Sequence, residues 1–544
     1  MRAFTIVSLV ALGAATAAAV VPSRAAEADP YHVAAICTAG PSNAGRRIVV
    51  SGGGAELQAA LDRATAGETI VLAPGATYRP KPGESFVLRN RPIPVGQWVV
   101  IRSADASFDA GGRRAEGVRV DAGDAPLMPR IRAAGGNAPA IRAEAGAHGY
   151  RLVGLDVGPD ENGSALVNLI ELGSGSDTAV DTEPHDVVID RSYVHGNDAG
   201  NFRRGVLMNG ARLAVIDSYV ANFHDANTDS QAIAGWNGPG PFKIVNNYLE
   251  AASENIIFGG TDPAIPNLVP ADIEIRGNLS TKRLAWRDAH VPVKNAFELK
   301  AARRVLVQGN TFEHVWQSGQ DGTAILFKSD NSNGNCTACV TEYVTFRDNI
   351  VRGAANGLTI NAAETGRKGM PLPRPANHIR IDNVLFEDIG PVWGRPGKLL
   401  RIMGGVADAS VTHVTSRSNP GGILDAKSSA DVNPGLTFTF NLVERLNYGI
   451  GAGSDEGTKT LQRNFSPYTY DHNVIVNTSA GGSQVVSDSV LASRYPRGTT
   501  ILHDWSEAGR FPNIGADMQA ITRAQQSARA ADGCGQAEPP SRQR

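Results

Sequence analysis

Two lysines on neighbouring strand-like segments are the residues of this chain best suited to chemistry. Lys300 lies in AFELKA (296–301), and Lys328 lies in AILFKS (324–329). In the first segment Phe297 and Leu299 alternate with charged residues, and in the second Ile325 and Phe327 match them. We therefore expect both lysines to point away from the core, side by side. Glu298 follows the same alternation and is the expected orienting partner of Lys300. Two stacked ammonium groups should lower the pKa of at least one lysine toward neutrality, as a lysine general base requires.

Loops before the neighbouring segments supply further polar side chains. HDANTDSQ (224–231) leads into AIAGWNGPGP (232–241), and SEN (253–255) leads into IIFGG. If these loops converge on the lysines, the indole ring of Trp236 could stack on a sugar. Arg287, in LAWRD, and Lys294 could bind a carboxylate. The alternative is a set of ordinary surface and packing residues. The candidate substrate-binding residues are Arg287, Lys294, Trp236, Asp229 and Glu254, with Asp225 as a further carboxylate and His224 as a further acid or base.

The elements that must position these residues repeat along the chain. Short apolar segments turn at a small polar residue, and a second strand-like set lies between them. Two short strands per repeat without a helix predict an all-β, single-stranded right-handed parallel β-helix, in which each coil stacks on the next. A propeller would show regular four-strand blades, and a β-sandwich would rarely run this long. The turn positions are Ser192, Ser218, Asn247, Asn278, Asn310, Asn349 and Asn383, at intervals of 26, 29, 31, 32, 39 and 34 residues.

Stacking of the coils makes a definite prediction about four of these turn residues. Equivalent positions on adjacent coils lie about 4.8 Å apart. We therefore expect Asn247, Asn278, Asn310 and Asn349 to line up at one inside corner, each buried and amide-paired with the next. The segment AELQAALDRATAG (55–67) predicts a short helix that caps the N-terminal end of the stack.

The chain divides into four parts by composition. A basic start, an apolar run and small residues at the N-terminus are typical of a signal peptide. We therefore expect a secreted or periplasmic protein with no membrane contact after signal cleavage. The expected parts are a signal peptide (1–26), an N-terminal extension (27–44), the β-helix (45–480), and a C-terminal capping segment with a flexible tail (481–544), including a helix over 516–530.

Charge and cysteine content narrow the functional classes. The 544 residues include 52 Lys and Arg against 54 Asp and Glu, a net charge of −2, which argues against a nucleic-acid partner. Cys336 and Cys339, in the CTAC sequence, predict a local disulfide in an exported protein, because no further zinc ligands lie nearby. Pairing of Cys37 with Cys534 stays open. We expect a monomer.

The repeats and the segment AGETIVLAPGATY (66–78) resemble the pectate-lyase-type, pectin-lyase-like β-helix proteins over most of residues 45–480. Residues 296–331 are similar to the core of the chondroitinase B/alginate lyase β-helix family. In that family a Lys is followed by a strand ending in Asn-Thr and then by an Arg on the next coil. The resemblance implies that Lys300 is the base, and it puts Lys328 at the position of the Arg, the proposed acid.

The resemblance also bears on calcium. The family binds calcium through acidic residues just before the lysine, and this chain reads Val293-Lys294-Asn295 there. Calcium is therefore a candidate cofactor for which the sequence identifies no ligands.

Together these residues predict an exported polysaccharide lyase that cleaves an acidic, uronate-containing glycan by β-elimination. Lys300 would be the base, Lys328 the acid or carboxylate neutraliser, and Arg287 and Lys294 the carboxylate binders. One alternative is a glycoside hydrolase that uses two carboxylates from Asp225, Asp229 and Glu254. Another is a non-catalytic carbohydrate-binding or surface protein, because a long β-helix offers an extended flat face.

Overall fold

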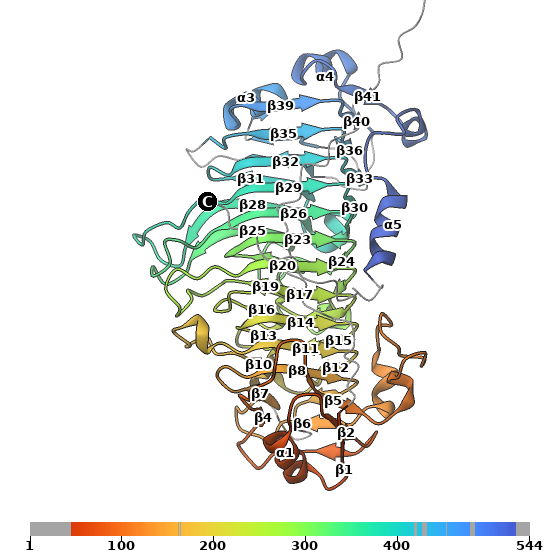
Figure 1. Ribbon diagram of the computed structural model, residues 1–544. Coiled ribbons are helices and arrows are strands. Elements are labelled where there is room, and N and C mark those ends of the chain that lie inside the picture. Colours follow the sequence, from red (N-terminus) through yellow and green to blue (C-terminus); the bar gives the residue numbers. More distant parts are fainter. Residues whose placement is uncertain are drawn as a thin grey trace, which may run out of the picture.

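The strands of successive coils stack in parallel into three long sheets, as the repeats predict. The computed structural model describes residues 45–160, 163, 165–417, 421–426, 432–445, 447–452, 454–478 and 485–528. Through most of the stack, each strand pairs with the strands three before and three after it, one from each neighbouring coil. Figure 1 shows the coil advancing from the red N-terminal end to the blue C-terminal end. The fold is an all-β, right-handed parallel β-helix.

The first sheet, sheet A, begins with the first strand of the chain. It consists of β1 (Arg47–Val50), β2 (Thr69–Leu72), β5 (Val99–Ser103), β8 (His148–Val153), β11 (His185–Asp190), β14 (Ala211–Ile216), β17 (Phe242–Val245), β20 (Ala271–Arg276), β23 (Ala302–Gln308), β26 (Thr341–Arg347), β29 (Asn377–Asp382), β32 (Ala407–Thr412), β35 (Leu436–Thr439) and β39 (Tyr468–Asp471).

Sheet B follows sheet A within each coil. It consists of β3 (Thr77–Tyr78), β6 (Arg130–Arg132), β9 (Asp156–Gly158), β12 (Tyr193–His195), β15 (Tyr219–Phe223), β18 (Tyr248–Ala251), β21 (Leu279–Thr281), β24 (Thr311–Val315), β27 (Ile350–Ala354), β30 (Leu385–Ile389), β33 (Thr415–Arg417), β36 (Leu442–Glu444), β40 (Val474–Val476) and β41 (Thr500–Leu502).

Sheet C completes the coil and carries the lysines. It consists of β4 (Phe86–Leu88), β7 (Ile141–Ala143), β10 (Ala165–Leu172), β13 (Asn201–Met208), β16 (Gln231–Gly235), β19 (Glu254–Phe258), β22 (Phe297–Leu299), β25 (Thr323–Asn331), β28 (Asn356–Thr365), β31 (Lys398–Met403), β34 (Gly422–Asp425), β37 (Ile450–Ala452) and β38 (Asp455–Glu456).

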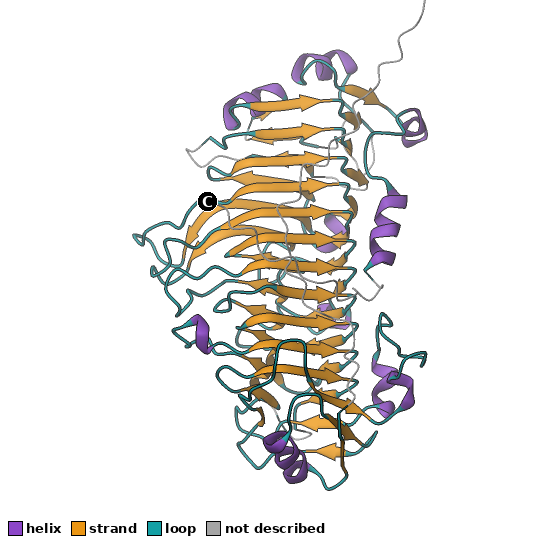
Figure 2. Ribbon diagram, viewed as in Figure 1, coloured by secondary structure: helices purple, strands orange, loops and turns teal. Residues whose placement is uncertain are grey.

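Helices lie mainly at the ends and along the right edge of the stack, with shorter helical segments on its other sides (Figure 2). Helix α1 (Gly54–Arg63) turns Leu57 and Leu61 onto the core, as expected for an N-terminal cap. Helix α5 (Met518–Ser527) lies within the range in which a C-terminal helix was predicted and runs beside the corner between sheets A and B. The other α-helices in the described part of the chain are α2 (Ala285–Asp288), α3 (Thr458–Asn464) and α4 (Asp488–Arg494).

The predicted asparagine ladder is present at the corner between sheets A and B. The backbone N–H and Nδ2 of Asn247 both donate to Asn278 Oδ1, at 2.8 and 3.0 Å. Asn278 donates in the same way to Asn310, and Asn310 to Asn349, over 2.8–3.0 Å. All four residues are at most 2 % exposed. An amide can satisfy its own copy on the next coil because it carries both donors and an acceptor.

The residue before each ladder position adopts a left-handed conformation, which explains the small polar punctuation of the sequence. Asn246, Gly277, Gly309 and Asp348 have φ between +54° and +68°, and Gly, Asn and Asp tolerate this region best.

Asn383 was placed one residue out of register by the sequence pattern. Arg347 pairs with Asp382, so Asn383 aligns with Asp348 in the left-handed position, with φ +54°. Val384 therefore takes the ladder position and is fully buried. The sequence could not separate the two positions, because Asn suits both.

The long interval between Asn310 and Asn349 leaves the stack unbroken. Strands β23 and β26 pair continuously in parallel across it, so the extra residues loop outward from the coil. Cys336 and Cys339 form the predicted disulfide, and both sulfur-bearing side chains are buried against Ala301 and Val269.

Several predictions fall on residues that lie outside the described part of the chain. They include the signal peptide, Cys37 and Cys534. Among the described residues, none of the helices is both long and apolar enough to cross a membrane.

Candidate functional site

Lys300 and Lys328 lie on the outward side of sheet C, on adjacent coils. Phe297 and Leu299 of β22 are fully buried in the core, and they pair with Ile325 and Phe327 of β25. Because each lysine directly follows a residue of the same pair, Leu299 and Phe327, the register aligns Lys300 with Lys328. The predicted juxtaposition therefore follows from the way the two strands stack.

A buried carboxylate lies between the two ammonium groups. Glu298 Oε1 is 3.6 Å from Lys300 Nζ and 4.0 Å from Lys328 Nζ. Glu298 is only 1 % exposed, and its Oε2 has no hydrogen-bond partner among the described residues. Lys328 also pairs with the half-exposed Glu364 at 2.6 Å. Both lysines are thus held by carboxylates, and one acceptor oxygen is left for a further donor.

The expected lowering of a lysine pKa is not found at Lys300. Burial opposes the charged form of Lys300, but the carboxylates of Glu298 and Glu254 outweigh it and raise the pKa. Burial raises the pKa of Glu298 to about 7, although Lys300 acts in the opposite direction. The lysine is therefore the ammonium at neutral pH, and Glu298 is the group that titrates there.

A second set of charges lies at the start of the neighbouring strands. Lys294 forms an ion pair with Asp229 at 2.6 Å. Glu254 is 1 % exposed and accepts from Gln231 Nε2 at 2.8 Å. Within the described residues its Oε1 has no hydrogen-bond partner. Electrostatic coupling links Lys294 to Glu298 and Asp229 to Lys300, so the two sets of charges form one site.

Trp236 is part of a cation–π pair on the same face. The guanidinium of Arg204, from β13, lies 4.9 Å from the centroid of the indole ring. Burial lowers the pKa of Arg204 to about 10, with Glu254 and Asp229 acting against it. Sequence reasoning missed Arg204, whose only signal was its place on a strand two coils before β19.

Three other candidates are engaged elsewhere. Arg287, on α2, donates to the Val392 carbonyl at 2.6 Å and lies over the ring of Trp393. Asp225 accepts the backbone N–H groups of its own loop. His224 lies beside Trp286 and bonds a backbone carbonyl. No contact joins these side chains to the lysine pair in the described structure.

Lys282, which the sequence analysis did not single out, lies beneath the site. It follows β21 and is 1 % exposed. Its Nζ lies within 2.8–3.1 Å of five oxygens, of which four are backbone carbonyls and one is Asn255 Oδ1. Burial lowers the pKa of Lys282 to about 7, while Glu254 and Glu250 pull it upward.

The residues at the position implied for calcium do not fit that ion. Calcium takes six to eight oxygen ligands, mainly carboxylates and carbonyls. Here Val293 is buried in an apolar cluster with Trp286, Lys294 is paired with Asp229, and the Asn295 carbonyl accepts from Lys282. Over the described ranges, no group of three Cys, His, Asp or Glu side chains could hold a metal ion.

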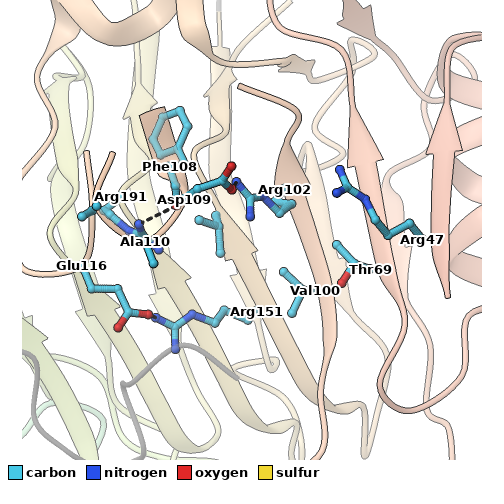
Figure 3. A pocket seen from close by; sticks show the side chains of 13 residues that line it. Arg47, Thr69, Val100, Arg102, Phe108, Asp109, Ala110, Glu116, Arg151 and Arg191 are labelled. Atoms are coloured by element: carbon cyan, nitrogen blue, oxygen red, sulfur yellow. Dashed lines mark hydrogen bonds and ion pairs between the residues drawn. The ribbon is translucent and has the colours of Figure 1, made fainter. Parts of the chain in front are cut away.

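A cavity of about 560 Å³ lies elsewhere, outside sheet A near the N-terminal end (Figure 3). Arg102, Arg151 and Arg191 line it, and each pairs with a carboxylate. The lysine pair is on another sheet, so this cavity is separate from the candidate site on sheet C.

Comparisons with known proteins support the fold. No family model matches the chain, and no curated protein matches its sequence. The PL6 family alginate lyase AlyGC is similar in structure, with 12 % identity and a TM-score of 0.50, over 91 % of this chain and 60 % of that one. This chain therefore matches well under two thirds of AlyGC. At such identity the likeness shows a shared β-helix fold.

Two further solved structures are similar at lower scores. A mannuronic acid specific polysaccharide family 6 lyase from human gut microbiota has 10 % identity and a TM-score of 0.46, over 88 % of this chain and 98 % of that one. The catalytic unit of a GH87 α-1,3-glucanase from Streptomyces thermodiastaticus strain HF3-3 has 12 % identity and a TM-score of 0.45, over 83 % and 72 %.

Proposed function

We propose that this protein is an exported polysaccharide lyase that cleaves an acidic, uronate-containing glycan by β-elimination. The observation that carries the proposal is the pair of aligned cations, Lys300 and Lys328, around the buried Glu298 on the outward side of sheet C. The fold shared with an alginate lyase supports it. Export rests on the N-terminal sequence alone.

β-Elimination on a uronate has three requirements. The sugar carboxylate must be neutralised, the weakly acidic C5 proton must be removed, and the leaving oxygen must be protonated. The two ammonium groups face the buried Glu298 and the half-exposed Glu364, so a uronate carboxylate would take the place of Glu364 at Lys328. A neutral glycan has no carboxylate to make this exchange.

Glu298 gives Lys300 a route to the base form. Lys300 is the ammonium at neutral pH, so it becomes a base only by passing its proton to Glu298 across their 3.6 Å separation. Because the pKa of Glu298 is about 7 and that of Lys300 is raised, this transfer is uphill and adds to the barrier of the reaction. The free amine then takes the C5 proton, the C–H electron pair becomes the C4–C5 double bond, and the C4–O bond breaks. The leaving oxygen takes a proton from the Lys328 ammonium. Lys300 and Lys328 thus keep the roles expected of them, and Glu298 becomes the proton acceptor for Lys300.

The neighbouring charges would bind the sugars that flank the cleaved bond. The half-exposed Lys294–Asp229 pair lies beside the lysines, and the Arg204–Trp236 pair lies further along the face. Lys294 and Arg204 would each bind a uronate carboxylate, and Trp236 would contact a sugar ring. Arg287, which bonds Val392, is left out of this site.

The hydrolase alternative receives less support. A hydrolase needs two carboxylates about 5–9.5 Å apart across the bond. Of the three candidates, Glu254 is buried, Asp229 is neutralised by Lys294, and Asp225 caps its own loop. A binding function without turnover would use the same outward face of sheet C.

The test is absorbance of an unsaturated uronate product on alginate, pectate, glucuronan and glycosaminoglycans, with a neutral α-glucan as the matched control. We expect ultraviolet absorbance to rise on at least one acidic glycan and to stay flat on the glucan. Reducing ends released without absorbance would instead indicate a hydrolase. Binding without either product would indicate a non-catalytic protein, and silence on every glycan with folded protein would reject the lyase.

A further inference from the structure

The surroundings of Lys282 are those of a bound cation. Five oxygens converge on its Nζ: the carbonyls of Ala251 and Ala252 at 3.0 Å, Ser253 at 2.8 Å, Asn295 at 3.1 Å, and Asn255 Oδ1 at 3.0 Å. Burial lowers the pKa of Lys282 to about 7, but the five acceptors oppose this shift, because the ammonium offers them three N–H donors and the neutral amine only two. A shell made only of oxygen is also the way proteins bind hard metal cations.

The cage joins the two segments that carry the candidate site. Ala251 ends β18, and Ala252 and Ser253 form the turn before β19, which begins with Glu254. Asn295 lies next to Lys294 and three residues before Glu298. The carboxylate of Glu254 acts on the Lys282 charge and also on Lys300. A cation at this point therefore fixes the distance between the start of β19 and the start of β22.

We propose that Lys282 is the internal cation of the site, a positioning residue whose ammonium fills the oxygen cage that would otherwise need a metal ion. The protein then needs no calcium to hold Glu254, Lys294 and Glu298 in place. The consequence for activity rests on the proposed lyase function, whereas the occupancy of the cage does not depend on it.

The first experiment removes the cation and offers a replacement. Lys282→Ala empties the cage and keeps its five oxygens, and Lys282→Met is the matched control that fills most of the space without a charge. We expect ammonium or potassium chloride to raise the melting temperature of Lys282→Ala by at least about 2 °C relative to equimolar N-methylglucamine chloride, whose cation is too large to enter. The wild type and Lys282→Met should show no such difference.

An alanine variant that melts alike in all three salts would overturn the proposal, as would a methionine variant with the same cation response. If Lys282→Ala does not fold, the proposal is tested on the wild type with and without calcium. Calcium should leave its melting temperature within about 1 °C of the chelator-treated protein. If calcium raises the melting temperature of the wild type and Glu254→Gln abolishes this rise, calcium binds in the site and the proposal fails.

The lyase rate is an independent measure of whether Lys282 positions the site. We expect chelator-treated wild type to keep its full lyase rate, and ammonium ions to restore part of the rate lost in Lys282→Ala but none of that lost in Lys282→Met. If no glycan is cleaved by the wild type, the lyase proposal fails and the melting experiment still tests the cage. If the wild type is active but ammonium rescues neither the rate nor the melting temperature, only the role of Lys282 fails.

Discussion

The asparagine corner and the lysine face are both stacks of like polar residues on adjacent coils, and they differ in what the stacking leaves over. At the corner, Asn278 and Asn310 satisfy one another, because an amide is both donor and acceptor. On sheet C, Lys300 and Lys328 can only donate, so their stack needs Glu298 between them. The corner is complete without a ligand. On the lysine face, Lys328 also pairs with the half-exposed Glu364, and Glu298 Oε2 has no hydrogen-bond partner among the described residues.

The two stacks show that polar residues of the same repeat can serve either stability or function. Both stacks come from the parallel pairing of strands on adjacent coils, in sheets A and B for the asparagines and in sheet C for the lysines. A buried polar ladder that is fully paired contributes to stability. A stack of like charges costs free energy and is therefore a candidate for function.

The largest expected effect is on activity. Lys300→Ala should lower lyase turnover by at least about 100-fold, because a positioned acid–base group contributes on this order. Its melting temperature should stay near that of the wild type, since the paired corner is untouched. The measurement is the initial rate of ultraviolet absorbance on the best acidic glycan. Lys459→Ala, which removes an exposed lysine of α3, is the control, and an alanine variant of Lys300 with wild-type turnover would exclude it as the base.

The next effect is on stability and concerns the corner. Asn310→Leu should lower the free energy of unfolding by about 1–3 kcal/mol, because the buried N–H and Nδ2 of Asn278 lose their acceptor and Asn349 Oδ1 loses one of its two donors. Asn349→Leu should cost less, since the next coil carries Val384 at the ladder position and only one side loses its partner. Denaturant titration of both variants measures the difference. Equal costs would mean that the asparagines act singly and not as a ladder.

A smaller effect should appear in the pH dependence of stability. Burial raises the pKa of Glu298 to about 7, so the native state keeps a proton that the unfolded chain loses near pH 4.5. The free energy of unfolding attributable to this group therefore falls as the pH rises from about 4.5 to about 7 and is constant above that.

Glu298→Gln cannot titrate, so its stability should fall less steeply than that of the wild type across this pH interval. Unfolding titrations at several pH values provide the comparison, and Asn310→Leu is the control that should keep the wild-type slope. Parallel curves for Glu298→Gln and the wild type would show that Glu298 has an ordinary pKa.

The smallest effect is expected at the rim of the lysine face. Glu364 pairs with Lys328 at 2.6 Å but is half exposed, and such pairs contribute at most about 1 kcal/mol. Glu364→Gln should change kcat/KM less than about threefold, with a larger change at low ionic strength. A loss as large as that of Lys300→Ala would place Glu364 inside the reacting site and not at its rim.

Features that recur with the coil could be predicted from the sequence. The alternation around Phe297 and Leu299 gave the lysine register, and the recurring Asn-containing turns gave the ladder. Asn383 was misplaced by one residue because its own type fits two adjacent positions. The CTAC disulfide was predicted from the local cysteine pair, the expected export of the protein and the lack of further zinc ligands nearby.

Features that depend on side chains from several coils could not be predicted. The direction of the Lys300 pKa shift is set by Glu298 together with Glu254, which lies on another coil, and alternation alone says nothing about how deeply a carboxylate is buried. The cage of Lys282 consists mostly of backbone carbonyls, which no residue type reveals. Arg204 was missed because its partner Trp236 lies on a different coil.

The C-terminal helix gives the stack a fixed length. Beside α5, Asp517 exchanges hydrogen bonds with Asn383, and at the far end Ser527 lies within hydrogen-bond distance of Arg276. Gly277 and Gly309 allow this contact, since a Cβ at either position would collide with Ala528 or Ala524.

The helix therefore bridges the coils from β20 to β29 over a fixed length. Repeat proteins are built from stacked, similar units. An added or deleted coil here would move Asn383 or Arg276 away from its end of α5. The coils of β22 and β25, which carry Lys300 and Lys328, lie within this span. Helix α5, at the corner between sheets A and B, thus restricts the number of coils in this span. The spacing of the charges on sheet C depends on that number.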